Sequence, residues 1–276
     1  MRVRIYTSNH KEKNYVLRAF HSGCNVPDLW IGDLDHYEPS DVAVVFGTYK
    51  KSVPVSYRRG HVIHEQKKHG LQTVIVETGY IDRGAGPDHY YAVGLNGING
   101  RADFRNDDSP SDRARKFFGK LKPWRSSGDH ILLCGQVPWD ASVQHIDFVG
   151  WTQSTAEVLQ GLTDRPIVYR PHPLAKTDPP TGTIKSKNYW IEDDFRNCWC
   201  TVTFNSNSGV DSVLSGIPAV AMDEGSMLKD MVANIGSIDN PPTPDRAQWL
   251  RDLAYAQWTP REMAQGETWD HLFRLT

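Results

Sequence analysis

Four consecutive residues, Arg170, Pro171, His172 and Pro173, combine side chains that bind anions with a stiff backbone. They follow an apolar run at 167–169, and the two prolines restrict the chain around His172. Arg170 can hold a phosphate through two parallel hydrogen bonds, and His172 can donate to a phosphate oxygen or to a leaving group. The segment is therefore a candidate anion site. The alternative is that both side chains satisfy carbonyl groups of their own loop.

A second candidate for anion binding is a group of small polar residues after the apolar run 201–204. The group consists of Asn205, Ser206, Asn207, Ser208 and Gly209. We expect Ser208 to cap a helix over 208–214, whose first backbone amides have no partner within the helix. Such amides, flanked by hydroxyl groups, suit a diphosphate, although an ordinary strand-to-helix turn uses the same residue types. Two segments of this kind after successive strands favour the binding interpretation.

Two residues of the next loop, Glu224 and Ser226, can complete such a site. Glu224 can accept hydrogen bonds from ribose hydroxyl groups, and Ser226 can add its hydroxyl and its amide to the phosphate contacts. A plain acidic loop is the alternative interpretation.

These segments need a scaffold that brings the ends of several strands together, and the sequence predicts one. Apolar runs alternate with helical segments, which is typical of a parallel sheet with helices on both faces. In the first half we expect strands at 3–6, 42–46 and 73–76 and helices over 12–21 and 56–69. In the second half we expect strands at 131–134, 167–169, 201–204 and 219–222 and helices over 152–160 and 208–214. The chain is therefore predicted to have an α/β fold, whose ligands bind at the carboxyl ends of the strands.

Residues 122–128 contain proline, serine and glycine and are interpreted as a linker between two domains. We expect a first domain at 1–126 and a second at 127–276. With 276 residues, of which 39% are hydrophobic, the chain can bury two modest cores. A helix is predicted over 111–121, before the linker. Another is predicted over 245–256, where apolar residues recur at helical spacing, and it is expected to return towards the first domain.

The composition excludes several classes of protein. The apolar stretches are far shorter than the roughly 20 residues of a membrane-spanning helix, and the N-terminus lacks the pattern of a signal peptide. We therefore expect a cytoplasmic protein without a membrane partner. The four cysteines are too scattered for a disulfide framework, and no histidine spacing indicates a metal site. The glycine patterns of a phosphate loop and of a dinucleotide-binding fold are also missing, so no such cofactor is expected.

The order of motifs along the second half resembles the donor domain of glycosyltransferases with the GT-B fold. Arg-Pro-His-Pro begins at Arg170, Asn-Ser-x-Ser-Gly-x-Asp begins at Asn205, and Ser-Gly-x-Pro-x-Val begins at Ser215. The similarity extends over 129–230 and points especially to capsular polysaccharide Kdo-type transferases and to bacteriophage DNA glycosyltransferases. It implies two Rossmann-like domains facing a cleft, the first binding the acceptor and the second the donor. The donor is then a UDP-sugar, with UDP-glucose as the first choice, bound by the residues named above without a metal ion.

The first half contains a segment, 76–83, that is similar to the Glu-Asp-Gly-Phe-x-Arg segment of the capsule enzymes. Thr78 occupies the place of their second acidic residue, so their catalytic carboxylate cannot be assigned by position. An inverting transfer to a hydroxyl group requires a nearby carboxylate or histidine as its base. The candidates are Glu77, Asp82 and Asp103. We expect Glu77 to face the cleft, and the alternative is that it pairs with Arg83.

A basic stretch in the first half indicates an anionic acceptor. Residues 49–69 carry several Lys and Arg side chains and tyrosines but a single acid, Glu65. Such a surface suits the phosphate backbone of DNA, with aromatic rings available to stack on a base. A glycine-rich loop expected at 90–103 can line the same cleft and leave room for a base flipped out of the duplex. The expected acceptor-binding residues are Lys50, Lys51, Tyr57, Arg58, Arg59, Asn99 and Arg101.

These patterns together predict the transfer of a sugar to 5-hydroxymethylcytosine in phage DNA. The partner is then double-stranded DNA with hydroxymethylated bases, and we expect a monomer that acts in the cytoplasm of the host cell. Two alternatives remain open. One is a transferase that builds a surface or capsular polysaccharide. The other is a UDP-sugar epimerase, which shares the donor site and needs no basic acceptor surface.

Overall fold

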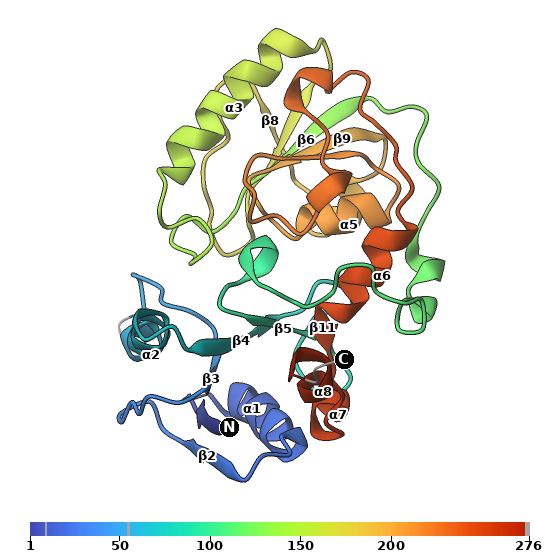
Figure 1. The fold of residues 1–276 in the computed structure, drawn as a ribbon. Coiled ribbons are helices and arrows are strands. Elements are labelled where there is room, and N and C mark those ends of the chain that lie inside the picture. The colour runs from blue at the N-terminus through green and yellow to red at the C-terminus, as the bar shows by residue number, and fades with distance from the viewer. Residues whose placement is uncertain (9, 54–55, 274–276) are drawn as a thin grey trace. The chain divides into compact units, whose positions relative to one another are not determined.

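The computed structural model describes residues 1–8, 10–53 and 56–273, and the chain forms two compact units (Figure 1). Unit 1 contains Met1–Arg113 and Arg251–Thr276, and unit 2 contains Ala114–Leu250. The second boundary falls inside helix α6, Ala247–Tyr255. The junction expected between residues 126 and 127 therefore lies within unit 2.

Unit 1 is built on a 6-stranded sheet with the order β11-β5-β4-β3-β1-β2. Its strands are β1 (Arg2–Tyr6), β2 (Asp28–Gly32), β3 (Val42–Phe46), β4 (Gln72–Thr78), β5 (Tyr91–Leu95) and β11 (Gln257–Trp258). The strands β1 to β4 pair in parallel, whereas β5 runs antiparallel to both β4 and β11. Every residue of β3 is buried, as expected for a central strand covered on both faces.

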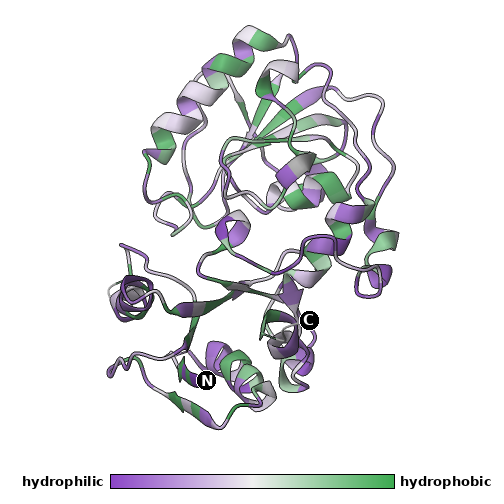
Figure 2. Cartoon of the chain, in the orientation of Figure 1, coloured by the Kyte–Doolittle hydropathy of each residue, from purple (hydrophilic) through white to green (hydrophobic). Residues whose placement is uncertain are grey.

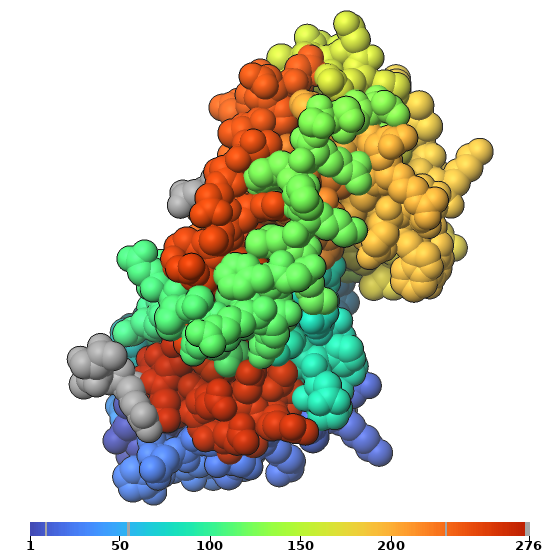
Figure 3. Space-filling view, turned by 90° about the vertical axis from the view of Figure 1, so that its right-hand side faces the viewer, coloured from blue at the N-terminus to red at the C-terminus, as the bar shows by residue number. Residues whose placement is uncertain are grey.

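Helices cover both faces of this sheet. They are α1 (Lys11–Gly23), α2 (Tyr57–Lys68), α7 (Pro260–Ala264) and α8 (Glu267–Phe273). One face is covered by α1 together with α7 and α8, whose buried residues are Val16, Leu17, Phe20, Met263, Trp269 and Leu272. Val62 of α2 packs against the other face. Figure 3 shows the red C-terminal residues directly against the blue N-terminal ones, so the end of the chain completes the core of unit 1.

Unit 2 has a 5-stranded sheet with the order β10-β9-β6-β7-β8, in which every pair is parallel. Its strands are β6 (His130–Cys134), β7 (Ile167–Arg170), β8 (Ile184–Lys185), β9 (Cys198–Thr203) and β10 (Ala219–Ala221). Its helices are α3 (Phe148–Leu162), α4 (Ile191–Asp194) and α5 (Ser208–Leu214). Ala156 and Leu159 of α3 are buried against the sheet, and Figure 2 shows polar and apolar bands alternating along this helix. Asp147 stabilises the start of α3 because its carboxylate accepts from the amide of Gly150.

Short 3-10 helices connect these elements. They are η2 (Asn99–Arg101), η3 (Ala114–Lys116), η4 (Phe118–Lys120), η5 (Lys229–Met231) and η6 (Ile235–Ser237). The predicted α/β class is confirmed, and every expected strand is present with small differences at its ends. No helix in the described part of the chain has the length and the apolar character that a membrane span requires.

The helix predicted over 111–121 is wrong, because this segment forms only the turns η3 and η4. Arg113, near its start, is buried and donates hydrogen bonds to the carboxylate of Glu262 and to the carbonyls of Ala254 and Gln257. These contacts fix the chain in a path that a continuous helix cannot follow. Gly119 further disfavours a helix at this position.

The glycine-rich loop predicted at 90–103 is wrong in its first part. Tyr91–Leu95 forms the buried strand β5 in the sheet of unit 1. A Cβ atom on Gly94 would lie 2.7 Å from Cε1 of Phe104. Glycine at this position therefore permits close packing inside the unit and leaves no room for a base.

The expected linker is packed onto unit 2 along 122–125. The backbone amide of Lys122 donates to the carbonyl of Leu214 at 2.9 Å, and the amide of Arg125 donates to Gly216 at 2.8 Å. The indole of Trp124 donates to the carbonyl of Pro244 at 2.9 Å. The composition of this stretch thus reflects an irregular path on the surface of unit 2.

Candidate functional site

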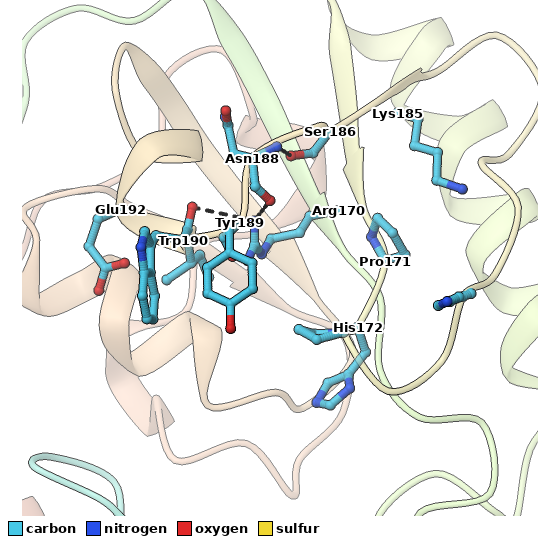
Figure 4. A pocket seen from close by; sticks show the side chains of 12 residues that line it. Arg170, Pro171, His172, Lys185, Ser186, Asn188, Tyr189, Trp190 and Glu192 are labelled. Carbon is cyan, nitrogen blue, oxygen red and sulfur yellow. Dashed lines mark hydrogen bonds between the residues drawn. The ribbon is translucent and has the colours of Figure 1, made fainter.

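A pocket of about 660 Å³ lies at the carboxyl end of β7 in unit 2 (Figure 4). One wall is the segment 170–173, and the other is the loop 186–192 that follows β8. Lys176 and Lys185 also line the pocket, and their charges suit an anionic ligand. This position matches the edge at which parallel sheets bind their ligands.

Arg170 lies at the base of this pocket, and its guanidinium group is already engaged. It forms an ion pair with the carboxylate of Asp194, and the side chains of the two residues are only 11% and 2% exposed. It also donates to the carbonyls of Asn188 at 3.2 Å and Tyr189 at 2.8 Å (Figure 4). These bonds match the alternative interpretation of the sequence, in which Arg170 satisfies loop carbonyls. In this arrangement Arg170 holds the pocket wall in place.

His172 is half-buried on the same pocket, and its Nδ1 atom accepts a hydrogen bond from the amide of Leu174 at 3.1 Å. Burial lowers the pKa of His172, the charge of Arg170 acts in the same direction, and Asp140 opposes both. The ring is therefore neutral near pH 7 and carries its proton on Nε2. A neutral imidazole of this kind can donate one hydrogen bond to an oxygen of a phosphate or of a leaving group.

Two aromatic residues at the pocket were not singled out in the sequence. Tyr189 is 79% exposed and Trp190 is 64% exposed, and their rings pack edge to face with centroids 4.6 Å apart. Figure 4 shows both side chains around the same opening as His172. Exposed aromatic rings that pack against each other suit stacking on a base or on the apolar face of a sugar. The signal in the sequence was two adjacent aromatic residues within a polar segment.

Asn205 is buried beneath the loops of unit 2. Its Nδ2 group donates to Asp223 Oδ2 at 2.9 Å and to the carbonyl of Ser142 at 3.1 Å, and its Oδ1 accepts from Gln136 Nε2 at 2.8 Å. The side chain thus joins the loops that follow three different strands. Asn205 therefore stabilises the arrangement of these loops at the edge of the sheet.

Ser206, Asn207 and Ser208 are half-buried at the start of α5. The helix begins at Ser208 with Asn207 as its N-cap, so the prediction that Ser208 is the cap is wrong by one residue. The hydroxyl of Ser206 accepts from the hydroxyl of Ser208 at 2.7 Å. Gly209 is buried in the first turn, where a Cβ atom would meet Leu228 Cδ1 at 3.1 Å. The binding of a diphosphate by these residues stays a prediction.

The two candidates in the loop after β10 differ in exposure. Glu224 is exposed, whereas Ser226 is buried and its hydroxyl accepts from the amide of Leu228 at 3.3 Å. Ser226 also donates from its amide to the carbonyl of Asp223. Ser226 therefore stabilises the turn from inside, and Glu224 is the one of the two that a ligand can reach.

The three candidate bases belong to unit 1. Glu77 is half-buried at the carboxyl end of β4, whereas Asp82 and Asp103 are exposed. The carboxylate of Asp103 accepts from Arg105 Nε at 3.0 Å. Arg83, the expected alternative partner of Glu77, donates to the carbonyl of Tyr80 at 2.8 Å. Of the three carboxylates, Glu77 has the most restricted surroundings.

Only some side chains of the basic stretch near α2 lie on the surface. Lys51 and Tyr57 are exposed, and Lys50 is half-buried. Arg58 is exposed and forms an ion pair with Asp35. Arg59, by contrast, is 6% exposed and donates to the carbonyl of Phe46 at 2.9 Å, so it is not part of the exposed basic surface that the sequence predicted. Consecutive residues of a helix point in directions about 100° apart, so Arg58 can face solvent while Arg59 faces the sheet.

Asn99 and Arg101 lie in η2 of unit 1. Asn99 has a φ angle of 51°, in the left-handed region that asparagine tolerates better than most residues. Arg101 is exposed. The described residues include no group of three or more His, Cys, Asp or Glu side chains that could hold a metal ion.

The two units, each with a sheet covered by helices, define an α/β protein. No protein-family model and no curated protein matches the sequence. A solved structure of KpsC from Thermosulfurimonas dismutans, described as a beta Kdo 2,7 transferase, is similar with a TM-score of 0.59 and 14% identity, covering 96% of this chain and 98% of that one. Another, described as a beta Kdo 2,4 transferase, has a TM-score of 0.57 and 15% identity, covering 93% of this chain and 90% of that one. The likeness confirms the predicted fold class, a GT-B type fold with two Rossmann-like domains.

Proposed function

We propose that this protein is a glycosyltransferase that takes its sugar from a nucleotide-activated donor bound in unit 2. The observation that carries the proposal is the pocket at the carboxyl end of β7, because it joins hydrogen-bond donors with exposed aromatic rings. His172 Nε2 and the ammonium groups of Lys176 and Lys185 can bind the phosphates. The rings of Tyr189 and Trp190 can stack on the base or on the sugar. The fold adds support, since the solved structures that share it are transferases.

The same groups account for the chemistry of the leaving phosphate. When the bond between the sugar and the phosphate breaks, negative charge collects on the leaving oxygen, and donors already in place stabilise it. We assign Glu77 as the base. It removes the proton of the acceptor hydroxyl group while the oxygen of that hydroxyl group attacks the anomeric carbon of the sugar. Asp82 and Asp103 are rival bases with less support because both are exposed.

For the acceptor we propose 5-hydroxymethylcytosine in double-stranded DNA, with UDP-glucose as the donor and a monomer as the acting form. The support is the exposed side chains of Lys51, Tyr57 and Arg58 near the start of α2. They can bind a phosphate backbone and stack on a displaced base. Because Arg59 is buried, this surface has fewer cations for binding DNA than the sequence indicated.

A saccharide acceptor is the second candidate. The observation in its favour is that the solved structures with this fold are described as Kdo transferases. Such an enzyme would use the same donor pocket and would not require the exposed cations near α2. A UDP-sugar epimerase is the remaining alternative and would need no acceptor.

The test separates these activities in one assay. The protein is incubated with hydroxymethylated, methylated or unmodified DNA, or with a panel of oligosaccharides, and with UDP-, GDP- and CMP-sugars in turn. Nucleosides from digested DNA and the oligosaccharides are then measured by mass. A hexose gained only on hydroxymethylated DNA supports the first acceptor, and a gain only on a saccharide supports the second. No transfer to any acceptor, with conversion of a UDP-sugar on its own, would leave the epimerase.

A further inference from the structure

Arg59 is a buried cation whose hydrogen-bonding groups are only partly used. One Nη1 hydrogen is donated to the carbonyl of Phe46 at 2.9 Å, and the residue is 6% exposed. Its Nε atom is buried and has no hydrogen-bond partner among the residues that the structure describes. Buried polar groups in native proteins are nearly always paired, so an unpaired guanidinium N–H group indicates a missing acceptor.

Gly47 keeps the space beside this guanidinium group free of side chains. It follows β3, its amide donates to Val76 of β4 at 2.8 Å, and its φ angle is +82°. A Cβ atom here would lie 3.3 Å from Arg59 Nη1 and 3.6 Å from Glu77 Oε1. The next residue, Thr48, also has a buried hydroxyl with no partner in the described chain. Unused donors of two residues therefore occur at the same strand end.

Lys13 of α1 adds a second cation to this place. Its ammonium group lies 5.3 Å from the centroid of the Phe46 ring, at the end of β3. Burial lowers the pKa of Lys13, and the charges of Arg59 and Lys50 lower it further, while Glu77 opposes them. The side chains of Lys13, Arg59 and Glu77 are thus close enough to influence one another at the end of β3.

We propose that the carboxyl end of β3 in unit 1 is a binding subsite for one phosphate group, which accepts hydrogen bonds from Arg59, Lys13 and Thr48. A phosphate has several oxygens that can accept from donors in different directions, and its charge compensates the cations. Lys13 is half-buried, so a ligand can reach its ammonium group from solvent. Assigning this phosphate to the acceptor rests on the proposed glycosyl transfer, because the subsite lies beside Glu77, the proposed base.

The test measures the NMR signal of the Arg59 Nε–H group while inorganic phosphate is added. Isotope-labelled protein is titrated at constant ionic strength, and the Nε–H signal of Arg59 is recognised by its loss in Arg59→Lys. We expect this signal to shift saturably with phosphate and to stay unchanged with chloride. Lys13→Gln is expected to raise the midpoint about tenfold, through the loss of one charge-assisted hydrogen bond. Lys67→Gln, a control at an exposed lysine of α2, is expected to leave the midpoint unchanged.

Two results would overturn the subsite. One is the absence of a saturable shift in the wild-type protein, and the other is an equal midpoint in Lys13→Gln and Lys67→Gln. The titration contains neither sugar donor nor acceptor. Its failure therefore concerns the subsite alone, and failure of glycosyl transfer leaves the subsite standing.

Discussion

At the scale of single residues, the pocket of unit 2 depends on a buried ion pair that lies behind its wall. Asp194 accepts from Arg170, from the hydroxyl of Ser186 at 2.6 Å and from Asn188 Nδ2 at 2.8 Å. Arg170 in turn binds the carbonyls of the loop that carries Tyr189. These bonds position the aromatic rings, so Arg170 contributes to ligand binding through the loop.

Arg170→Ala is expected to unfold unit 2 more easily and to weaken donor binding. The change leaves the carboxylate of Asp194 buried without its cation, which costs about 3–5 kcal/mol of unfolding free energy. Urea unfolding followed by circular dichroism measures this cost. Lys185→Ala, at the same pocket, is the control and should change stability little. A loss below about 1 kcal/mol in Arg170→Ala would show that the pair does not hold the loop.

At the scale of elements, the C-terminal segment supplies one strand and two helices to unit 1. β11 pairs with β5, and α7 begins with a capping box between Thr259 and Glu262. The carboxylate of Glu262 also receives two hydrogen bonds from Arg113, at 3.0 and 3.2 Å. The guanidinium group of Arg113 lies 3.7 Å from the centroid of the Trp258 ring. One arginine thus joins the end of the first segment to the returning chain.

Arg113→Ala is expected to lower the unfolding free energy by about 3–5 kcal/mol, because Glu262 loses its buried partner. The neighbouring Arg115 is exposed, so Arg115→Ala is a matched control with an expected effect within about 0.5 kcal/mol. Urea unfolding of both variants gives the comparison. Equal stability of the two variants would contradict the role of Arg113.

His271 in α8 makes the stability of unit 1 depend on pH. Its Nε2 atom bonds to the carbonyl of Phe104 at 2.8 Å. Burial lowers the pKa of His271 below the ordinary 6.5, and Arg113 and Arg105 act in the same direction, while the bond to Phe104 and the charge of Asp103 oppose them. Below that ordinary value the unfolded chain binds a proton that the folded chain does not. Stability is therefore expected to fall as the pH drops below 6.5. His271→Gln should flatten this dependence, and parallel curves for the two proteins would exclude His271 as a cause.

At the scale of the whole molecule, the reactivity of the four cysteines measures how well the two cores exclude solvent. All four are free and buried. Burial raises the pKa of Cys24, Cys134 and Cys198 to about 12, and it also raises that of Cys200. A thiol reacts as its thiolate, so buried thiols with raised pKa values react slowly.

Native protein is therefore expected to give almost no reaction with a disulfide reagent at mildly alkaline pH. The same protein in concentrated guanidinium should expose every thiol. The absorbance of the released chromophore counts the reacted groups in both cases. Rapid reaction of a thiol in the native protein would show that one core opens easily.

The sequence predicted most strands of both units well, because short runs of apolar β-branched residues favour buried strands over other structures. It missed β2, β5, β8 and β11. Gly94 hides β5 within a glycine-rich stretch, and β8 and β11 are only two residues long. It also misplaced 111–121, where the contacts of Arg113 with distant carbonyls decide the path. For the site, the residues 170–173 line a pocket, and their binding of a phosphate stays a prediction. The sequence could not reveal that Arg170 is engaged by Asp194, or that Arg59 points inwards, because both depend on contacts distant in sequence.

The discontinuity of unit 1 has a consequence for biosynthesis. A ribosome delivers all of unit 2 as one stretch, whereas unit 1 stays incomplete until β11, α7 and α8 have been synthesised after it. Until then Val16, Leu17 and Phe20 of α1 lack the Met263, Trp269 and Leu272 that cover them. We therefore expect the first part of unit 1 to present an open apolar face until these later elements have been synthesised. We expect unit 1, although its synthesis starts first, to complete its core after unit 2.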